Sequence, residues 1–269
     1  MTAAVAPVTL AIFGGGNMGE ALLSGLIDAG WCPPDELAVV EVLAPRRAQL
    51  GERYPGVVVG DVIVQCAGAV IAVKPQDVAP AVTAAVAAGA RRVLSIAAGV
   101  TVAALEAAAD DPEVAIVRAM PNTPALVRAG ASAISPGRAA REDDLVWASS
   151  ILEAVGTVTR LPESQLDAVT GLAGSGPAYV MLVAEALIEG GVLVGLPRPT
   201  ARALVTQLLV GSAALLERTG EPPEVLRANV TSPGGTTAAG LRALEVHGVR
   251  AAFLDAVSCA TERSRELGA

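Results

Sequence analysis

Aromatic residues, histidine and cysteine are scarce in this chain of 269 residues. Phe, Trp and Tyr together make up 2% of the sequence, so the core has to be built mainly from Ala, Val and Leu. The single histidine, His247, excludes a metal site with several histidine ligands, and we expect no metal. Cys32, Cys66 and Cys259 are odd in number and widely spaced, which indicates free thiols in a reducing cytoplasm.

Long apolar runs, an excess of basic charge and a leader segment are also missing. No apolar span reaches the roughly 18 uninterrupted residues that a membrane helix needs, so we expect no membrane partner. The net charge of −8 disfavours a nucleic-acid partner. The first residues lack the pattern of a signal peptide, which favours a cytoplasmic location. A hydrophobic share of 52% against 17% charged residues predicts a folded protein with a large subunit interface.

The pattern of apolar residues changes near residue 162. Before this point, short β-branched runs alternate with helical patterns, which is typical of βαβ units and a parallel sheet. The expected strands are 8–13, 37–42, 57–59, 69–73, 93–96, 115–118 and an antiparallel edge strand at 132–135. After this point, apolar residues recur at helical spacing, interrupted at 174–177. We therefore predict an α/β dinucleotide-binding domain at 1–162 and an all-helical domain at 163–269.

The first expected strand leads into a glycine-rich turn with the spacing G-x-G-x-x-G. In such a turn the first glycine allows a tight bend, the second lets the backbone approach a pyrophosphate, and the third lets helix and strand pack. The phosphates bind free N–H groups at the helix N-terminus. The position between a strand and a helix favours dinucleotide binding over a purely steric turn. The residues assigned to it are Gly14, Gly15, Gly16, Asn17, Met18 and Gly19.

Two opposite signals for the form of the cofactor follow the second expected strand. Glu41 lies 22 residues after Gly19, where an acid hydrogen-bonds the ribose hydroxyls of NAD. Arg46 and Arg47 lie just beyond. They suit the 2′-phosphate of NADP, and they are equally typical of a solvated helix start. The sequence therefore leaves NAD and NADP open.

Lys74 is the only lysine of the chain, against eighteen arginines. Pro75 follows it and ends the strand at the edge where open α/β sheets bind ligands. A role near the nicotinamide ribose, or as a proton donor, competes with that of a simple strand-end lysine. The loop at 120–124 is interpreted as a support beside the site, with a plain rigid turn as the alternative.

The segment 231–237, Thr-Ser-Pro-Gly-Gly-Thr-Thr, is the most informative part of the second half. The N–H groups of Gly235, Thr236 and Thr237 would form a pocket for a carboxylate at a helix N-terminus, with the threonine hydroxyls as further partners. Capping of this helix by Ser232 or Thr236 alone is the alternative.

Assembled, these stretches resemble the pyrroline-5-carboxylate reductases, the last enzymes of proline biosynthesis. The resemblance covers nearly the whole chain, and the last two motifs together are specific to that family. The motifs are Phe13-Gly-Gly-Gly-Asn-Met-Gly-Glu-Ala-Leu, Ala72-Val-Lys-Pro, Ala97-Ala-Gly-Val-Thr, Met120-Pro-Asn-Thr-Pro, Leu166-Asp-Ala-Val-Thr-Gly, Gly174-Ser-Gly-Pro-Ala-Tyr and Thr231-Ser-Pro-Gly-Gly-Thr-Thr.

The resemblance implies a Rossmann-like parallel-sheet domain followed by an all-helical dimerisation domain. It implies reduction of 1-pyrroline-5-carboxylate to L-proline with NADPH or NADH, in homodimers that assemble into a decamer. Ala44 stands where many NADP-using relatives carry a serine. The further cofactor-binding positions are Glu41, Ala44, Arg46, Ala72, Val73, Lys74, Pro75, Ala98 and Asn229. The substrate-binding positions are Glu163, Asn229, Gly235, Thr236 and Thr237, of which Thr237 is the expected catalytic residue.

Two other functions compete with this one. A β-hydroxyacid dehydrogenase has a similar two-domain plan, but it needs a lysine on the interdomain helix, and no lysine follows residue 74. A dinucleotide-binding module without catalysis would not need the threonine–glycine segment at 231–237.

Overall fold

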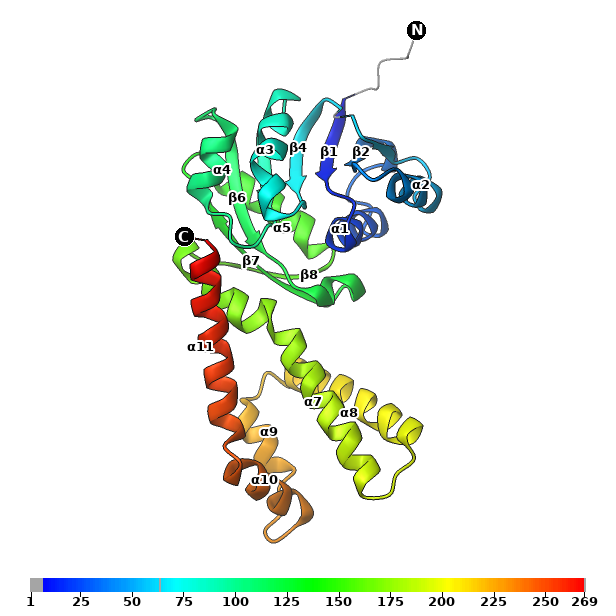
Figure 1. The fold of residues 1–269 in the computed structure, drawn as a ribbon, viewed down its shortest axis with the longest axis vertical. Coiled ribbons are helices and arrows are strands. Elements are labelled where there is room, and N and C mark those ends of the chain that lie inside the picture. Colours follow the sequence, from blue (N-terminus) through cyan, green and yellow to red (C-terminus); the bar gives the residue numbers. More distant parts are fainter. Residues whose placement is uncertain (1–6, 63, 269) are drawn as a thin grey trace. The chain divides into compact units, whose positions relative to one another are not determined.

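The computed structural model describes residues 7–62 and 64–268 of the chain. The chain forms two compact units. The sheet unit comprises the chain up to Ser175 together with the residues from Cys259 onward, and the helical unit comprises Gly176–Ser258. Figure 1 labels most of their helices and strands.

Within the described residues, the sheet unit contains one sheet with the strand order β3-β2-β1-β4-β5-β6-β7-β8. Neighbouring strands are parallel except β6 and β7, which are antiparallel. The order 3-2-1-4-5-6 of the first six strands is that of doubly wound folds, in which ligands bind beyond the carboxyl ends of the strands. The strands are β1 (Val8–Phe13), β2 (Leu37–Val40), β3 (Val58–Gly60), β4 (Cys66–Ile71), β5 (Arg92–Ser95), β6 (Ala115–Met120), β7 (Gly130–Pro136) and β8 (Gly156–Arg160).

The expected antiparallel strand at 132–135 is present as β7, but its expected place at the sheet edge is wrong. The strand β8 pairs with β7 in parallel, from Gly130 opposite Gly156 to Ile134 opposite Arg160. Strand β8 reads Gly-Thr-Val-Thr-Arg and none of its residues is buried. It therefore lacks the apolar signal that marks the other strands, and the sequence pattern misses it.

Helices cover both faces of the sheet and give two separate cores (Figure 1). Leu and Ile side chains dominate the first core, and small Ala and Val side chains dominate the second. The first core is lined by α1 (Asn17–Asp28), α2 (Ala44–Arg53) and α5 (Glu142–Glu153). The second is lined by α3 (Val78–Ala87) and α4 (Val102–Ala109). The alternation of β1 explains the division, because Leu10 and Ile12 face the first core, and Ala11 and Phe13 the second.

After the sheet, the described chain is helical, as the sequence predicts. The short helix α6 (Leu166–Val169) continues into a π-helical turn at Thr170–Gly174, and Ser175 interrupts the helix where the sequence predicts a break. The following helices are α7 (Gly176–Leu193), α8 (Arg198–Thr219), α9 (Pro223–Asn229), α10 (Thr236–Val246) and α11 (Val249–Leu267).

The helical unit leaves most of its apolar side chains uncovered. Among its described residues, Ala201 and Val205 are the only buried hydrophobic ones. Leu193, Val194 and Val246 are each more than 70% exposed. By length and composition alone, the stretches Glu163–Leu193 and Arg198–Thr219 would be long enough to cross a membrane. Apolar surface of this extent requires a cover, because its exposure to water is unfavourable.

Candidate active site

The glycine turn between β1 and α1 has the geometry that its spacing predicts. Gly14 has a φ of +102°, and a Cβ there would lie 2.6 Å from the carbonyl oxygen of Ala72. A Cβ on Gly19 would collide with the carbonyl oxygen of Gly14. A Cβ on Gly16 would meet no other atom of the described chain within 4 Å. The first and third glycines are therefore required by the fold, and the second leaves open space above the turn.

The open space lies at the N-terminus of a helix that no side chain caps. Gly16 is the N-cap residue of α1, with extended backbone. The N–H group of Gly15 donates a hydrogen bond to the Glu41 side chain. The first-turn N–H groups and the positive end of the helix dipole remain available to an anion. These residues therefore fit the pyrophosphate of a dinucleotide.

Glu41 follows directly after β2 and supports this turn. Its side chain is 8% exposed, and its Oε2 accepts a hydrogen bond of 2.9 Å from the Gly15 N–H. Its Oε1 accepts one of 2.8 Å from the Leu43 N–H. The structure thus places Glu41 at the end of β2, as the sequence predicts, and also beside the glycine turn. Sequence reasoning did not identify its hydrogen bond to the turn.

Arg46 also contacts the turn, and it pairs with Glu20, a partner that sequence reasoning missed. Its Nε donates a hydrogen bond of 2.6 Å to the carbonyl oxygen of Gly15, and its guanidinium pairs with Glu20. Glu20 also accepts hydrogen bonds from Arg53 and Tyr54. Burial alone would raise the pKa of Glu20, but the hydrogen bonds from Arg46 and Tyr54 and the nearby positive charges lower it below its usual value. The signal for Glu20 is that it is the only acid in the first turn of α1.

The segment Ala72–Pro75 lies beside the glycine turn. The Ala72 N–H donates a hydrogen bond of 2.8 Å to the carbonyl oxygen of Phe13. Lys74 is exposed at the end of this segment and forms no ion pair within the described chain. Pro75 and Ala98 line one hollow of about 340 Å³ within the sheet unit. Gly99, Thr170, Ser175, Ala260, Arg263, Ser264 and Leu267 complete its lining.

Glu163, expected to bind substrate, contacts the protein itself. Its Oε1 accepts hydrogen bonds of 2.7 Å from the Val102 N–H and 2.8 Å from Arg118. The first bond satisfies the N-terminus of α4, and the second neutralises an arginine whose side chain is 8% exposed. Glu163 therefore joins α4, β6 and the start of the helical sequence, and a role in substrate binding stays a prediction.

Replacing Glu163 by alanine is expected to lower the free energy of unfolding by about 2 to 3 kcal/mol, because Arg118 would be left buried without its partner. Urea denaturation measures this change. Glu142→Ala is the matched control, since it breaks the exposed ion pair with Arg160 and should cost less than about 1 kcal/mol. If Glu163→Ala cost no more than the control, the pair with Arg118 would not stabilise the fold.

The amide nitrogen and oxygen of the Asn122 side chain, in the loop at 120–124, both form hydrogen bonds within the protein. Its Nδ2 donates to the carbonyl oxygen of Ala173 at 3.1 Å, and its Oδ1 accepts from the Ala131 N–H at 2.9 Å. The side chain is 9% exposed. Asn122 thus holds the π-helical turn at Thr170–Gly174 beside β7, and the loop supports the segment that lines the hollow.

The second predicted anion site lies at the start of α10. Gly235 is the N-cap residue, with a ψ of 175°, and no side chain caps the helix. The alternative that Ser232 or Thr236 serves only as a cap is therefore wrong. Gly234 has a φ of +69°, which favours glycine. The first-turn N–H groups of α10 are left available to a carboxylate, and Thr237 lies in that turn.

The three cysteines are free thiols, as predicted. Burial raises the pKa of the Cys32 thiol to about 11. Burial raises the pKa of Cys66 to about 11, so this thiol stays protonated at neutral pH. Within the part of the chain that the structure describes, no group of three or more His, Cys, Asp or Glu side chains could hold a metal ion.

Comparison with known proteins shows to which family this chain belongs. The chain is 46% identical to the pyrroline-5-carboxylate reductase of Synechocystis sp. over 97% of its own length and 98% of that protein. This chain belongs to the pyrroline-5-carboxylate reductase family. The reductase of Mycobacterium tuberculosis is 44% identical to it, with 96% of each chain covered. The resemblance that the motifs predict is confirmed.

Solved structures and family models agree with this membership. The pyrroline-5-carboxylate reductase of Coxiella burnetii superimposes with a TM-score of 0.90 at 33% identity, covering 97% of this chain and 99% of that one. The Plasmodium falciparum enzyme, solved with NADP bound, has a TM-score of 0.84 at 29% identity, covering 97% and 98%. Residues 9–99 match the family described as NADP oxidoreductase, coenzyme F420-dependent. Residues 163–267 match that described as pyrroline-5-carboxylate reductase dimerisation. The predicted fold class is confirmed.

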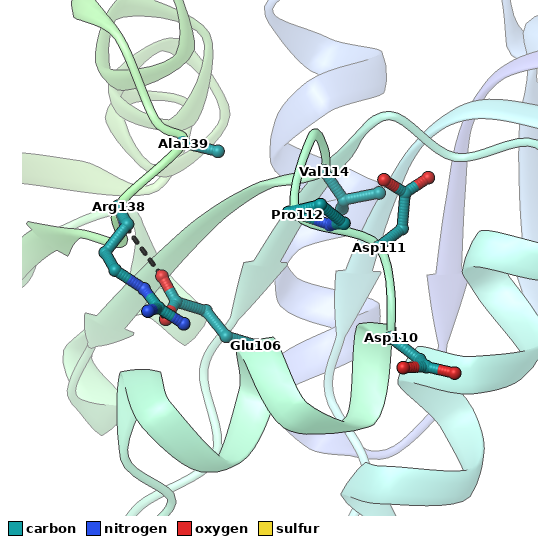
Figure 2. Close-up of a pocket in the computed structure, with 7 residues that line it drawn as sticks. All are labelled: Glu106, Asp110, Asp111, Pro112, Val114, Arg138 and Ala139. Carbon is teal, nitrogen blue, oxygen red and sulfur yellow. Dashed lines mark hydrogen bonds and ion pairs between the residues drawn. The ribbon is translucent and has the colours of Figure 1, made fainter.

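One further hollow of this pyrroline-5-carboxylate reductase family member is not part of the site. It encloses about 420 Å³ between the end of α4 and the loop after β7 (Figure 2). Arg138 donates two hydrogen bonds to Glu106 there, from its backbone N–H at 2.6 Å and its Nε at 2.8 Å. The hollow lies where β6 begins, at the amino ends of the parallel strands, whereas the glycine turn follows the carboxyl end of β1. Its arginine is already neutralised by Glu106.

Proposed function

We propose that this chain reduces 1-pyrroline-5-carboxylate to L-proline with NADPH or NADH, the last step of proline biosynthesis. The observation that supports this most is the presence of two helix N-termini, at α1 and α10, that no side chain caps and that glycines precede. One suits the pyrophosphate of the cofactor, and the other suits the carboxylate of the substrate. When bound, the nicotinamide supplies the hydride that the imine carbon accepts.

The residues of the helical unit would position the substrate. The N–H groups of Gly235, Thr236 and Thr237 would bind the carboxylate, which fixes the ring in one orientation. The Thr237 hydroxyl would hydrogen-bond the ring nitrogen and stabilise its proton. A threonine hydroxyl is a weak acid, so the proton arrives from solvent or with the protonated imine. Asn229 ends α9 just before this segment and is proposed to contact both ligands.

The sheet unit would position the cofactor. The glycine turn holds the pyrophosphate, and the segment Ala72–Pro75 with Ala98 is proposed to line the nicotinamide half. Lys74 is exposed and without an ion pair in the described chain, so its ammonium group is available to a ribose hydroxyl. Residues 1–162 are proposed to serve as the dinucleotide-binding domain and residues 163–269 as the substrate and dimerisation domain.

The uncovered apolar side chains of the helical unit support a homodimer, which we propose assembles into a decamer in the cytoplasm. A second copy would bury apolar surface that is otherwise exposed to water. Dimerisation is also the proposed means by which the cofactor of one subunit and the carboxylate site completed by its neighbour meet at one substrate molecule. We propose neither a membrane nor a nucleic acid as a partner, and the net charge of −8 disfavours the nucleic acid.

Steady-state oxidation of NADH and NADPH, with pyrroline-5-carboxylate as the acceptor, tests the proposed activity. We expect substrate-dependent oxidation and the formation of proline. Reduction of NAD+ or NADP+ by a β-hydroxyacid, without turnover of the imine, would favour the dehydrogenase alternative, which the absence of any lysine after residue 74 disfavours. Cofactor binding without turnover of any cyclic imine would favour a non-catalytic module.

A further inference from the structure

NAD and NADP differ only at the 2′ position of the adenosine ribose, which lies near the carboxyl end of β2 in folds with this strand order. NADP carries a phosphate there, with a charge of about −1.5 to −2 at neutral pH by analogy with phosphoserine. Tight binding of such a group needs donors that are cationic and free to turn toward it. The residues after β2 therefore decide between the two cofactors.

Each nitrogen of the first candidate cation, Arg46, already has an acceptor in the described chain. Its Nε donates to the carbonyl oxygen of Gly15 at 2.6 Å, and its guanidinium also contacts Gln49 at 3.3 Å and pairs with Glu20. The side chain is 24% exposed. Its contacts hold the glycine turn, so turning Arg46 toward a 2′-phosphate would break the support of the pyrophosphate site.

The second candidate cation, Arg47, is occupied as well. Its Nη1 donates to the carbonyl oxygens of Glu41 and Val42, at 2.9 and 2.8 Å. Its Nη2 forms an ion pair of 3.0 Å with Asp61. The guanidinium therefore binds the backbone at the end of β2, and a carboxylate already neutralises its charge.

Glu41 adds a negative charge at the same place. Within the described chain its carboxylate forms no ion pair, although each oxygen accepts one backbone N–H. Each oxygen has a further lone pair, which can accept a ribose hydroxyl. A 2′-phosphate would instead meet a like charge. The exposed neighbours Val42, Leu43 and Ala44 offer no side-chain donor.

We propose that this chain selects NADH over NADPH, because Glu41 accepts the ribose hydroxyls while Glu20 and Asp61 keep Arg46 and Arg47 away from a 2′-phosphate. The inference rests on the proposed reduction only for the identity of the hydride donor. It concerns the choice between two forms of the cofactor, which the family membership leaves open.

Titration of the full-length protein with NADH and NADPH in the absence of substrate, followed by nicotinamide fluorescence, measures both dissociation constants without turnover. We expect NADH to bind about tenfold more tightly, the effect of roughly one unmatched charged contact. Equal binding, or tighter binding of NADPH, overturns the proposal. Because no imine is present, this result is independent of whether the chain reduces pyrroline-5-carboxylate.

The variant Asp61→Asn tests the mechanism of selection. It removes the ion pair of Arg47, so NADPH should bind about three- to tenfold more tightly while NADH binding changes less than about twofold. Glu52→Gln is the matched control, because Glu52 is an exposed acid on α2 and the change in net charge is the same. If both variants improved NADPH binding equally, general charge rather than Arg47 would explain the effect, and the role of Asp61 would be overturned.

Discussion

Replacement of Thr237 by alanine is expected to lower kcat by about a hundredfold, the lower end of the effect of a group that assists proton transfer. Thr237 lies in the first turn of α10, where the N–H groups have no side-chain cap. The alanine variant keeps those N–H groups and hence the carboxylate site. It loses only the hydroxyl that is proposed to bind the ring nitrogen.

Three measurements separate this role from a structural one. The dissociation constant of the cofactor should stay within about twofold of wild type, because the hydroxyl does not cap the helix. The variant Thr237→Ser should recover most of kcat, since it restores the hydroxyl. Thr219→Ala is the matched control, because the Thr219 hydroxyl already donates to the carbonyl oxygen of Leu215. A Thr237→Ala variant with wild-type kcat would contradict the proposed role.

The parts of the fold that the sequence predicts are those with a strong local pattern. The first strand, Val8–Phe13, and the last helix, Val249–Leu267, have the predicted bounds, because their apolar periodicity is uninterrupted. The strand at Gly156–Arg160 was missed because its side chains are partly or fully exposed and mostly polar. Its place in the sheet is decided by backbone pairing with β7, which side-chain periodicity does not report.

The candidate site likewise has features that the sequence predicts and features that only the folded chain shows. Both helix N-termini are visible in the sequence, since glycines and threonines at fixed spacing have a local backbone cause. The partners of charged side chains are not visible. Arg46 reaches Glu20 across 26 residues, and Arg118 reaches Glu163 across 45. Only the folded sheet brings these residues together, so the sequence left the role of Arg46 open and that of Glu163 to family resemblance.

The glycines of the first turn allow its two functions, folding and cofactor binding, to be separated. The Gly19→Ala variant should lose stability, because its Cβ would collide with the carbonyl oxygen of Gly14, a backbone atom that cannot turn away. Overpacking of this kind costs about 1 to 3 kcal/mol or more. Urea denaturation should therefore show an earlier unfolding transition.

The Gly16→Ala variant should instead keep its stability and lose affinity for the cofactor. The φ of Gly16 is −67°, which alanine adopts without strain, and its Cβ would meet no atom of the described chain within 4 Å. Stability should therefore change by less than about 0.5 kcal/mol. The same Cβ would occupy the space above the uncapped N-terminus of α1, so a pyrophosphate would be pushed off its N–H donors. Loss of one or two charge-assisted hydrogen bonds predicts that NADH and NADPH both bind about ten- to hundredfold more weakly. If Gly16→Ala bound the cofactor as tightly as wild type, the pyrophosphate would have to lie elsewhere than at this helix N-terminus.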